Sequence, residues 1–564
     1  MKPISSNMFK LTAISAMILS TTSASAALYQ VIEVTPPTTF TFESVYGVAI
    51  QPGNVADDNP LGCFADGTTD CASSFKLAGE TRLVATHAGQ AIDGLSYREE
   101  APFGIDNGFI YVQDDARDFE RYCRTALRYA ICETWADIRW NVWKKEINGD
   151  QTPNSIAFVE GQATPIDETK NVVVNSLTAN AEPIGITLTP GDVTGSRRNS
   201  VKAIGIVDIT TEPESNWPQT RAWKTDGTYT VGSVARKATN NEGNFYTSKG
   251  AIWDSSGRMT EIPWPSNNAN HNNRLAQGSL RDVMAKDGNI YAVGYNTFYD
   301  DRNFMQASVS SVKVGESNWI TKPVAGATVR ENGTSGDFIH SNSLLTAVNK
   351  NGIAIGEAKL SRAESGAYSN RLFVVPNIND PKANFLNGSI FFAGAGGKAG
   401  AINNFNEIVG QIDTEETREV GGKPRRKRGF IYPYGTLEQG SVPERQAIFN
   451  NRAWLLDDLT NGGAFSGDNN QYRIIAATDI NDAGIIAATA LKCTGGYDST
   501  AHNAQCGAGK GQEKTVAVKL VPIAGQTHEN ISPRGTDNPV VERNGAGLGL
   551  WSLILGGLLW FRRK

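Results

Sequence analysis

The sequence predicts a mostly β protein, in which small antiparallel sheets repeat around a propeller-like ring that carries a short α-helical insert. Three observations support this fold class. A strand–turn–strand pattern recurs along the chain, 57 of the 564 residues are glycine, and apolar and charged residues make up 40% and 20% of the chain. This balance is typical of a globular protein rather than a disordered one. The ring is expected to hold about seven or eight sheets, and the alternative fold is two consecutive β domains.

The recurring pattern is a strand end, a polar turn of Asn, Asp or Gly, and a second strand that closes on a small residue. Its copies are Met284–Gly294, Ala347–Gly356, Ala401–Gly410 and Ile480–Ala487. Asn and Asp hydrogen-bond to nearby backbone and Gly accepts positive φ, so the pattern indicates a hairpin. The turn residues are spaced by 64, 54 and 78 residues, and each interval can hold one small sheet. Short alternating strands at such intervals favour a propeller.

A second strand–turn–strand pattern occurs in Gly250–Ile262, Arg221–Tyr229 and Arg428–Leu437. Together the two patterns resemble the HAF-type repeat of bacterial extracellular proteins, over roughly residues 220–490. The resemblance implies an exported β-repeat protein and brings no catalytic residues with it.

Residues 1–26 have the organisation of a secretory signal peptide. Lys2 and Lys10 give a positive start, Leu11–Leu19 is a short apolar run, and Ala24–Ala26 offers small residues for cleavage. We therefore expect signal peptidase to cut between Ala26 and Ala27 and the body to be exported. The alternative, a membrane anchor, is disfavoured because the apolar run is short.

The predicted β body covers residues 27–532 and has a strand-like run at each end. These runs are residues 28–34 and 515–521. In a propeller, strands from the two ends of the chain often share a sheet. We therefore expect the two runs to lie in one sheet and to close the ring.

Six cysteines lie in the exported part, an even number that predicts disulfides in an oxidising compartment. Cys493 and Cys506 bracket one loop and are expected to pair. For the other four, local pairing favours Cys63–Cys71 and Cys123–Cys132, and cross-pairing between these two sets is the alternative. These other four cysteines are Cys63, Cys71, Cys123 and Cys132.

Residues 115–147 are the one long helical pattern, and they form the predicted insert. On a straight helix Cys123 and Cys132 would be separated by about 13 Å and would lie on opposite faces. A disulfide between them therefore requires the helix to break. The aromatic side chains of the insert are expected to pack the helices onto the β body, and a binding surface is the alternative. They are Tyr122, Tyr129, Trp135, Trp140 and Trp143.

Motifs for catalysis, metal binding or cofactor binding are scarce. The chain has five His and none forms a metal-ligand pair, and no Gly-x-Ser-x-Gly elbow is present. Gly394–Ala399 fits a dinucleotide pattern only nominally, because the β repeat and not a helix follows it, so it is interpreted as a flexible loop. We predict no cofactor and no metal.

Two charged stretches are interpreted first as solvated loops. Oxygen-bearing side chains near Cys63 and Cys71 do not follow EF-hand spacing, so a Ca²⁺ site is only the alternative. Lys423–Arg428 is a basic run, interpreted as a hairpin tip, with contact to an anionic surface polysaccharide as the alternative. The net charge of -5 gives no basic footprint for nucleic acid. The candidate calcium ligands are Asp57, Asp58, Asn59, Asp66 and Asp70.

The C-terminal segment has three parts. A predicted linker covers residues 533–544, and a sorting tail covers residues 545–564. The tail contains the apolar run 548–561, a transmembrane helix of about 21 Å that is short for a hydrocarbon core of about 30 Å. Arg562–Lys564 should stay cytoplasmic, which places the body across the inner membrane.

This tail resembles the GlyGly-CTERM sorting signal of Gram-negative bacteria. The resemblance implies cleavage by a rhomboid-like sortase and display at the outer surface or release, with the type II secretion machinery as a further candidate partner. The motif here is Gly545, Ala546 and Gly547, which departs from a Gly-Gly pair and leaves the cleaved bond open. Signal, repeats and tail together resemble an uncharacterised bacterial family, the domain of unknown function numbered 3466.

Two hypotheses for function follow. The first is a surface-directed binding or structural module without chemistry of its own, which predicts no polar cluster with shifted pKa values in the central channel. The second is an extracellular polymer-degrading hydrolase or lyase with its site in that channel. It predicts two or more carboxylates that converge there at a separation suited to glycoside chemistry. The scarcity of catalytic motifs favours the first hypothesis.

Overall fold

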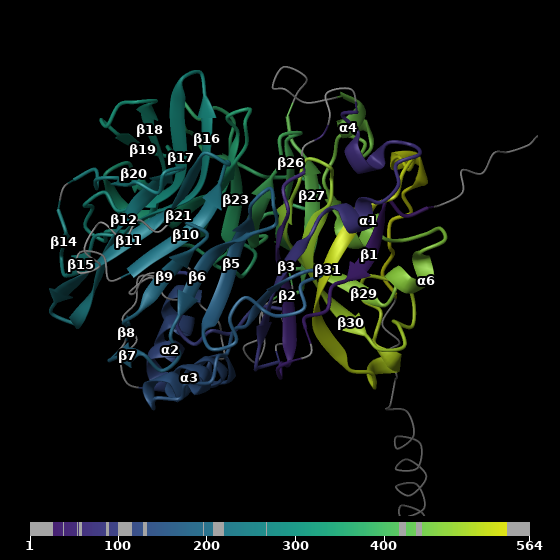
Figure 1. Ribbon diagram of the computed structural model, residues 1–564, viewed down its shortest axis with the longest axis horizontal. Helices are drawn as coiled ribbons and strands as arrows, with labels where there is room; N and C mark the ends of the chain where they lie inside the picture. The colour runs from purple at the N-terminus through teal and green to yellow at the C-terminus, as the bar shows by residue number, and fades with distance from the viewer. Residues whose placement is uncertain are drawn as a thin grey trace, which may run out of the picture.

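The protein is a ring of small antiparallel sheets (Figure 1). Within the described residues six sheets have three or more strands, and one of them contains two sheet units joined by a single parallel pair between β9 (Val201–Ile204) and β10 (Gln219–Thr225). The ring therefore has seven units, which we call blades 1 to 7. The computed structural model describes residues 26–37, 39–53, 55, 59–85, 89–99, 115–127, 132–195, 197–206, 219–266, 268–416, 425–435 and 443–537.

Blades 1 to 4 follow one another along the first part of the chain. From the innermost strand outward, blade 1 contains β2 (Ser44–Ile50), β3 (Leu77–Arg82) and β4 (Ala157–Val159), and blade 2 contains β5 (Asn171–Leu177), β6 (Pro183–Leu188) and β9. Blade 3 contains β10, β11 (Tyr229–Asn240), β12 (Gly243–Asp254) and β13 (Met259–Glu261). Blade 4 contains β16 (Gly278–Lys286), β17 (Asn289–Asn296), β18 (Gln306–Lys313) and β19 (Ile320–Pro323).

Blades 5 to 7 complete the ring, and the short strand β20 (Val329–Asn332) adds to blade 5 beside β21. Blade 5 contains β21 (Ser335–Val348), β22 (Ala354–Leu360), β23 (Asn370–Val375) and β24 (Asn384–Phe385). Blade 6 contains β25 (Gly397–Ile402), β26 (Glu407–Asp413), β27 (Lys427–Pro433) and β28 (Trp454–Leu455). Blade 7 contains β29 (Tyr472–Ile480), β30 (Ile486–Cys493), β31 (Glu513–Pro522) and β1 (Tyr29–Glu33). Two short hairpins lie outside the blades: β7 (Val193–Thr194) with β8 (Arg197–Arg198), and β14 (Asn270–His271) with β15 (Arg274–Leu275).

The innermost strands contact one another in a closed order. β2 packs on β5, and contacts continue through β10, β16, β21, β25 and β29, which returns to β2. The expected propeller-like arrangement is therefore present in the described part of the chain.

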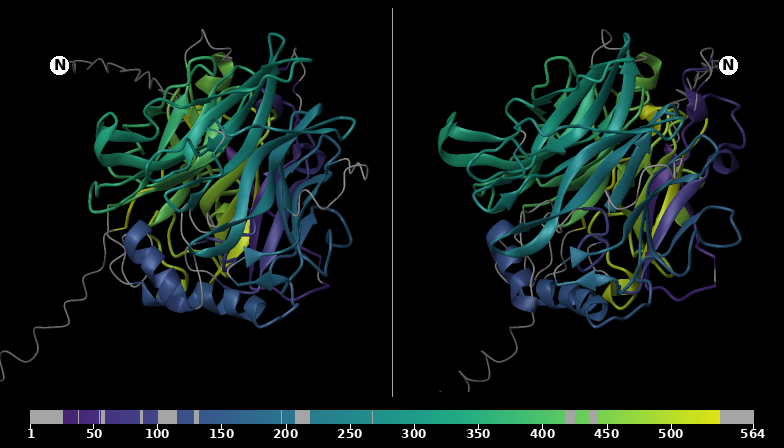
Figure 2. Two further views of the ribbon diagram at one scale, coloured as in Figure 1. Left: turned by 90° about the vertical axis from the view of Figure 1, so that its left-hand side faces the viewer. Right: turned by 60° about the vertical axis from the view of Figure 1, so that its left-hand side comes forward.

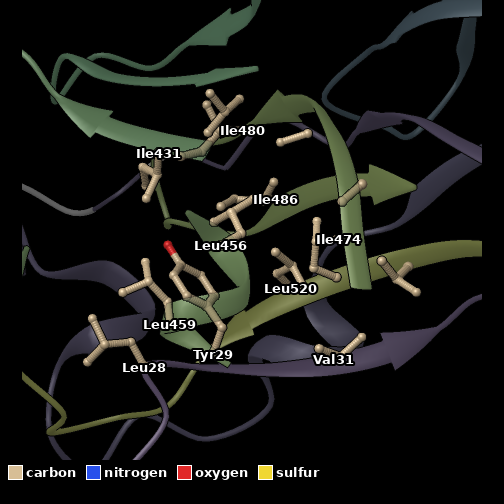
Figure 3. Packing of buried hydrophobic residues seen from close by; sticks show 14 of the residues in the cluster. Leu28, Tyr29, Val31, Ile431, Leu456, Leu459, Ile474, Ile480, Ile486 and Leu520 are labelled. Atoms are coloured by element: carbon tan, nitrogen blue, oxygen red, sulfur yellow. The ribbon is translucent and has the colours of Figure 1, made fainter. Parts of the chain in front are cut away.

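The two ends of the body meet in blade 7, as the sequence predicts. β1 pairs antiparallel with β31, so that Val31 lies opposite Leu520. Figure 3 shows Leu28, Tyr29 and Val31 packed on side chains from β29, β30 and β31. Each of these three residues is buried, and burial of such a side chain stabilises a fold by about 1.5–3 kcal/mol. The N-terminal strand thus holds the ring closed.

The recurring Asn-rich turns join neighbouring blades. Asn349 Nδ2 donates to the carbonyl oxygen of Asn403 at 2.9 Å, Asn403 Nδ2 donates to that of Asn481 at 3.1 Å, and Asn481 Nδ2 donates to that of Gln51 at 3.1 Å. These contacts run from blade 5 through blades 6 and 7 to blade 1. Because all three Asn residues are buried, these bonds are shielded from water. The repeat in the sequence therefore encodes contacts between blades as well as the hairpin turn.

The helical insert breaks between its cysteines, as predicted. Helix α2 (Ala116–Tyr122) continues into the π-helical turn η2 (Cys123–Leu127), and helix α3 (Glu133–Ile147) begins a new segment. The break brings the Cα atoms of Cys123 and Cys132 to 5.7 Å, within disulfide range. The structure contains this bond and the other two favoured pairs, Cys63–Cys71 and Cys493–Cys506.

The insert packs against one end of the ring, where Figure 2 shows its blue helices. Trp143 is fully buried and lies against Gly94, and the guanidinium of Arg198 covers its ring. Tyr122 and Trp135 are also buried. The predicted packing onto the β body therefore holds for Trp143, whereas Tyr122 and Trp135 stack on each other within the core of the insert. Tyr129 lies outside the described residues.

The remaining helices are short connectors. Among the described residues no helix is both long and apolar enough to cross a bilayer. The predicted signal peptide up to residue 25 and the predicted tail helix 548–561 lie outside the described residues. The connectors are η1 (Gly62–Phe64), α1 (Cys71–Ser74), α4 (Pro443–Ala447), α5 (Leu456–Leu459), α6 (Ser466–Asn469), η5 (Gly507–Gly509) and η6 (His528–Asn530).

Candidate functional site

Each of the seven innermost strands has a β-bulge at the same level of the ring. At the bulge one residue has no partner on the second strand of its blade, and such bulges redirect side chains. The unpaired residues are Val48, Asn175, Trp223, Arg281, Thr346, Gly400 and Thr478.

A glycine faces the bulge in six of the seven blades, and Ala488 takes this place in blade 7. The bulge brings a carbonyl oxygen of the inner strand close to this position. A Cβ atom on Gly232 would lie 1.8 Å from the oxygen of Arg221, and one on Gly356 would lie 2.2 Å from that of Leu344. The bulge therefore favours the glycine that closes the sequence repeat, and the blade 7 bulge accommodates the small side chain of Ala488 instead.

A cavity of about 480 Å³ lies inside the ring of innermost strands. All seven bulge residues line it, so every blade contributes to its wall. Part of the wall comes from the segment that precedes the helical insert, including Arg98 and Glu99, and Arg139 of α3 also lines it. We call this cavity the central channel, and it is the candidate functional site because ligand sites in ring folds occupy such concave positions.

Lys224 of blade 3 carries a positive charge into the central channel. Its Nζ lies 3.7 Å from Asp282 of blade 4 and 3.9 Å from Asp479 of blade 7. Both Asp side chains also accept backbone N–H groups of the next blade: Asp282 from Val348 at 2.9 Å and Asp479 from Ile50 at 3.1 Å. The two carboxylates therefore connect neighbouring blades, and Lys224 neutralises them.

The pKa values of these three groups are shifted. Burial raises the pKa of the Asp282 and Asp479 carboxyls above the usual value, although Lys224 and the backbone donors act in the opposite direction. Burial alone would lower the pKa of Lys224, but the two carboxylates outweigh it and raise that pKa. The hypothesis of a binding module predicted no polar cluster with shifted pKa values in the channel, and this prediction is wrong.

The carboxylates that line the channel all have partners among the described residues. Glu99 accepts from Arg281 at 2.6 Å, and that guanidinium covers the ring of Trp223 at 3.5 Å. Asp413 pairs with Lys427 at 3.0 Å. Each partner holds its carboxylate in place along the wall by a charge-assisted contact. The remaining lining carboxylates are bonded to Arg82, Arg98 or backbone N–H groups: Glu80, Asp93, Glu357 and Asp479.

The glycine-rich segment at residues 394–399 is not a flexible loop, contrary to the sequence interpretation. Its second half is the start of β25, the innermost strand of blade 6, and it lines the channel. Close packing explains its glycines, because a Cβ on Gly397 would lie 2.7 Å from the oxygen of Gln411. Lys398 within it is exposed and faces the channel.

The basic run at residues 423–428 is not a solvated hairpin tip either. Lys423 and Pro424 lie outside the described residues, but Arg425 and Arg428 are only 4% and 7% exposed. Arg428 Nε lies 2.8 Å from Asp457, and Arg425 lies 3.7 Å from Asp413. Carboxylates distant in sequence therefore draw the run into the body, and Arg425 and Lys427 line the channel.

The predicted processing sites are partly described. The N–H groups of Ala26 and Ala27 donate to the carbonyl oxygens of Asn530 and Gly462, so these residues lie against the body. Residues 533–537 of the predicted linker also pack on it, because Nε of buried Arg534 donates to the backbone carbonyl oxygen of Asp457 at 2.6 Å. The predicted tail site of Gly545, Ala546 and Gly547 lies outside the described residues.

The candidate calcium ligands are also partly described, because Asp57 and Asp58 lie outside the described residues. Asp66 and Asp70 are described, and no group of three or more His, Cys, Asp or Glu residues within the described ranges could hold a metal ion. The structure therefore adds no support to a Ca²⁺ site there.

The channel residues Trp223, Arg281 and Thr346 were missed from the sequence. A signal for the last two does exist, because each lies six or seven residues before the turn residue of its repeat, Gly352 for Thr346 and Gly288 for Arg281. This nearly constant distance reflects the position of the bulge in each innermost strand.

Comparison with protein families gives one match. The model of the family described as "Protein of unknown function (DUF3466)" matches residues 225–564. No curated protein matches the chain. The comparison therefore identifies a family without assigning an activity.

The solved structures to which the chain is similar include three whose names give different activities. The α-L-arabinanase of Cellvibrio cellulosa is 9% identical, with a TM-score of 0.25 over 46% of this chain and 88% of that chain. The β-propeller domain of the Trilobed protease from Pyrococcus furiosus is 10% identical, with a TM-score of 0.28 over 60% and 84%. The Trypanosoma rangeli sialidase bound to the inhibitor DANA is 8% identical, with a TM-score of 0.27 over 88% and 58%.

Proposed function

We propose that this chain, which belongs to the DUF3466 family, is an exported binding module whose ligand occupies the central channel. One observation carries the proposal. A cavity of about 480 Å³ is bounded by one unpaired bulge residue from each of the seven blades. A bulge costs a ladder hydrogen bond, and bulges are common beside ligand sites because they re-aim side chains. Their repetition around one cavity supports a binding role.

The state of the channel carboxylates favours binding over hydrolysis. Glycoside hydrolysis needs one carboxylic acid that donates a proton and one carboxylate that attacks or activates water. Asp479 accepts backbone N–H groups through both oxygens, from Ile50 at 3.1 Å and Ile480 at 3.0 Å. Glu99 and Asp413 are held by Arg281 and Lys427. Groups bound in this way position a ligand more readily than they exchange protons with it.

The test is a screen of the purified exported protein against glycans and other extracellular polymers, with hydrolysis products followed in the same wells. We expect binding without turnover. Turnover would contradict the proposal and would direct attention to the channel carboxylates as catalysts. The absence of both binding and hydrolysis with every polymer would also contradict the proposal and would leave a structural role.

A channel-filling variant locates the binding. Thr346 is a bulge residue that lines the channel, and its side chain makes no hydrogen bond to the described residues. Thr346→Trp should therefore abolish binding while the protein stays folded. Thr334→Trp is the matched control, because Thr334 is exposed near the tip of the β20–β21 hairpin. Equal binding by both variants would place the ligand outside the channel.

We propose further that the chain is processed at both ends. The signal-like residues 1–26 and the tail 545–564 support cleavage by signal peptidase and by a rhomboid-like sortase, followed by passage to the surface, with the type II secretion machinery as a candidate carrier. The intact mass of the mature protein should correspond to a chain that begins at Ala27 and ends near Gly545–Gly547. A mature chain that still contains Arg562 would rule out tail processing.

A further inference from the structure

The charge of the channel wall is uneven. Eight Lys and Arg side chains line the cavity against six Asp and Glu side chains, so the wall carries an excess of positive charge. Four of these cations are matched in number by four carboxylates, as in the pairs Arg98–Glu80, Arg281–Glu99 and Lys224–Asp479. The four cations are Arg98, Arg139, Lys224 and Arg281, and the four carboxylates are Glu80, Asp93, Glu99 and Asp479. The excess therefore belongs to the remaining part of the ring.

Blades 5 and 6 hold the excess cations, and we call this group the basic sector. It consists of Lys359 of β22, Lys398 of β25, Arg425, and Lys427 of β27. Two buried carboxylates, Glu357 of β22 and Asp413, stand against these four cations. Asp413 is shared between Arg425 and Lys427 at 3.7 Å and 3.0 Å. The sector therefore has a net excess of positive charge, which a low-dielectric channel wall focuses onto the cavity.

Lys398 is the cation of the basic sector that is open to a ligand. Its side chain is exposed, it lines the channel, and its Nζ contacts no acceptor among the described residues. Glu357 lies on the neighbouring blade, but its Oε2 accepts the backbone N–H of Ala399 at 3.1 Å. Lys398 therefore has a charge and three donors available in the channel.

Neighbouring blades add hydrogen-bond donors without acceptors. Arg281 is 3% exposed, and its Nη1 has no hydrogen-bond partner within the described residues. The same is true of Trp223 Nε1, which lies under the Arg281 guanidinium. The Thr346 hydroxyl is also unbonded, and it lies on the blade between Arg281 and Lys398. Arg281 Nη1 and Trp223 Nε1 are themselves buried, so their unmet hydrogen bonds cost free energy. Thr346 is half-buried and offers its hydroxyl at the channel wall.

We propose that the ligand of the central channel is an acidic saccharide whose carboxylate binds at Lys398. The channel offers an excess of cations and donors, and its carboxylates are already bonded, so it is complementary to a ligand rich in anionic and hydroxyl oxygens. Tyr368 lines the basic sector with a partly exposed ring, which gives an apolar face for a sugar ring. This inference rests on the proposed binding function and names its ligand class.

The test is calorimetric titration of the exported protein with a galacturonic acid oligomer, the neutral galactose oligomer of the same length, and inorganic sulfate. We expect the acidic oligomer to bind about tenfold or more tightly than the neutral one, with an affinity that falls as salt is added. Lys398→Gln should weaken binding of the acidic oligomer by about three- to fivefold. Lys398→Arg should restore most of it, because it keeps the charge.

The matched control is Lys350→Gln, which removes the charge of an exposed lysine that does not line the channel. It should leave the affinity unchanged. Equal affinity for the neutral oligomer, or an unchanged affinity in Lys398→Gln, would overturn the inference. Sulfate that competes with the acidic oligomer would support recognition of the anion, whereas sulfate that binds when neither oligomer does would overturn the assignment to a saccharide.

The two proposals fail in different ways. A neutral polymer that binds wild type and not Thr346→Trp would keep the channel as the site and would overturn the acidic ligand. A polymer of either charge that binds Thr346→Trp as well as wild type would overturn the channel itself.

Discussion

Single residues in this protein gain their roles from where the blades place them. Lys224, Asp282 and Asp479 come from blades 3, 4 and 7, and they meet across the channel. Nothing local in the sequence distinguishes them from the other charged residues, because their partnership exists only in the closed ring. The same applies to Arg428, whose buried partner Asp457 lies in another segment.

The residue Lys224 can be tested by substitution. Lys224→Met should lower the free energy of unfolding by about 1–3 kcal/mol at neutral pH, because two carboxylates in the channel lose their cation. The loss should shrink in acid, because both Asp carboxyls have raised pKa values and become neutral in the folded protein before they do in the unfolded chain. Urea unfolding at pH 7 and pH 4.5 measures this effect.

Lys237→Met is the control, since Lys237 is an exposed lysine of the same blade. A Lys224→Met protein as stable as this control would show that the carboxylates do not need their cation.

His340 gives the protein a pH-dependent stability. Burial, with a smaller contribution from Arg371, lowers the pKa of His340 to about 4. The unfolded chain binds a proton near pH 6.5 and the folded protein does not, so stability is lost as the pH falls from about 6.5 toward 4. Between pH 7.5 and pH 5, wild type should lose about 1 kcal/mol more stability than His340→Phe. Equal losses in urea unfolding would contradict this role.

At the scale of elements, the hairpin turns could be predicted from the sequence and the bulges could not. A turn is local, and its Asn, Asp and Gly residues are visible in Ala347–Gly356 and Ala401–Gly410. A bulge is a property of the register between two strands, and only the glycine opposite it leaves a trace. Sequence reasoning therefore found Gly356 and Gly410 but missed Thr346 and the wall that it belongs to.

The bulge explanation predicts a cost for filling the space at its glycine. In Gly356→Ala the new Cβ would meet the Leu344 oxygen at 2.2 Å and the Phe373 ring at 2.8 Å. We expect the free energy of unfolding to fall by about 2–4 kcal/mol. Gly467→Ala is the control, because no atom lies within 4 Å of that position and α6 is helical there. Denaturant unfolding of both variants measures this cost, and equal stability of Gly356→Ala and Gly467→Ala would contradict the explanation.

At the scale of the whole molecule, the closure of the ring could be anticipated and its central site could not. The strand-like runs at the two ends of the body predicted that both would lie in one sheet, and β1 pairs with β31 there. The basic sector could not be anticipated, because it combines residues 394–399, which are interpreted from the sequence as a loop, with residues 423–428, which are interpreted as a hairpin tip. Only the ring brings Lys398 and Lys427 to one wall, where Asp413 pairs with Lys427.

The central claim is that the ligand occupies the channel, and hydrogen–deuterium exchange of the exported protein with and without bound acidic oligomer tests it most directly. Occupation of the channel should slow exchange around the bulges of several blades at once, near Trp223, Thr346 and Gly400. Protection confined to the outer elements, such as β19 or the β14–β15 hairpin, would contradict the claim.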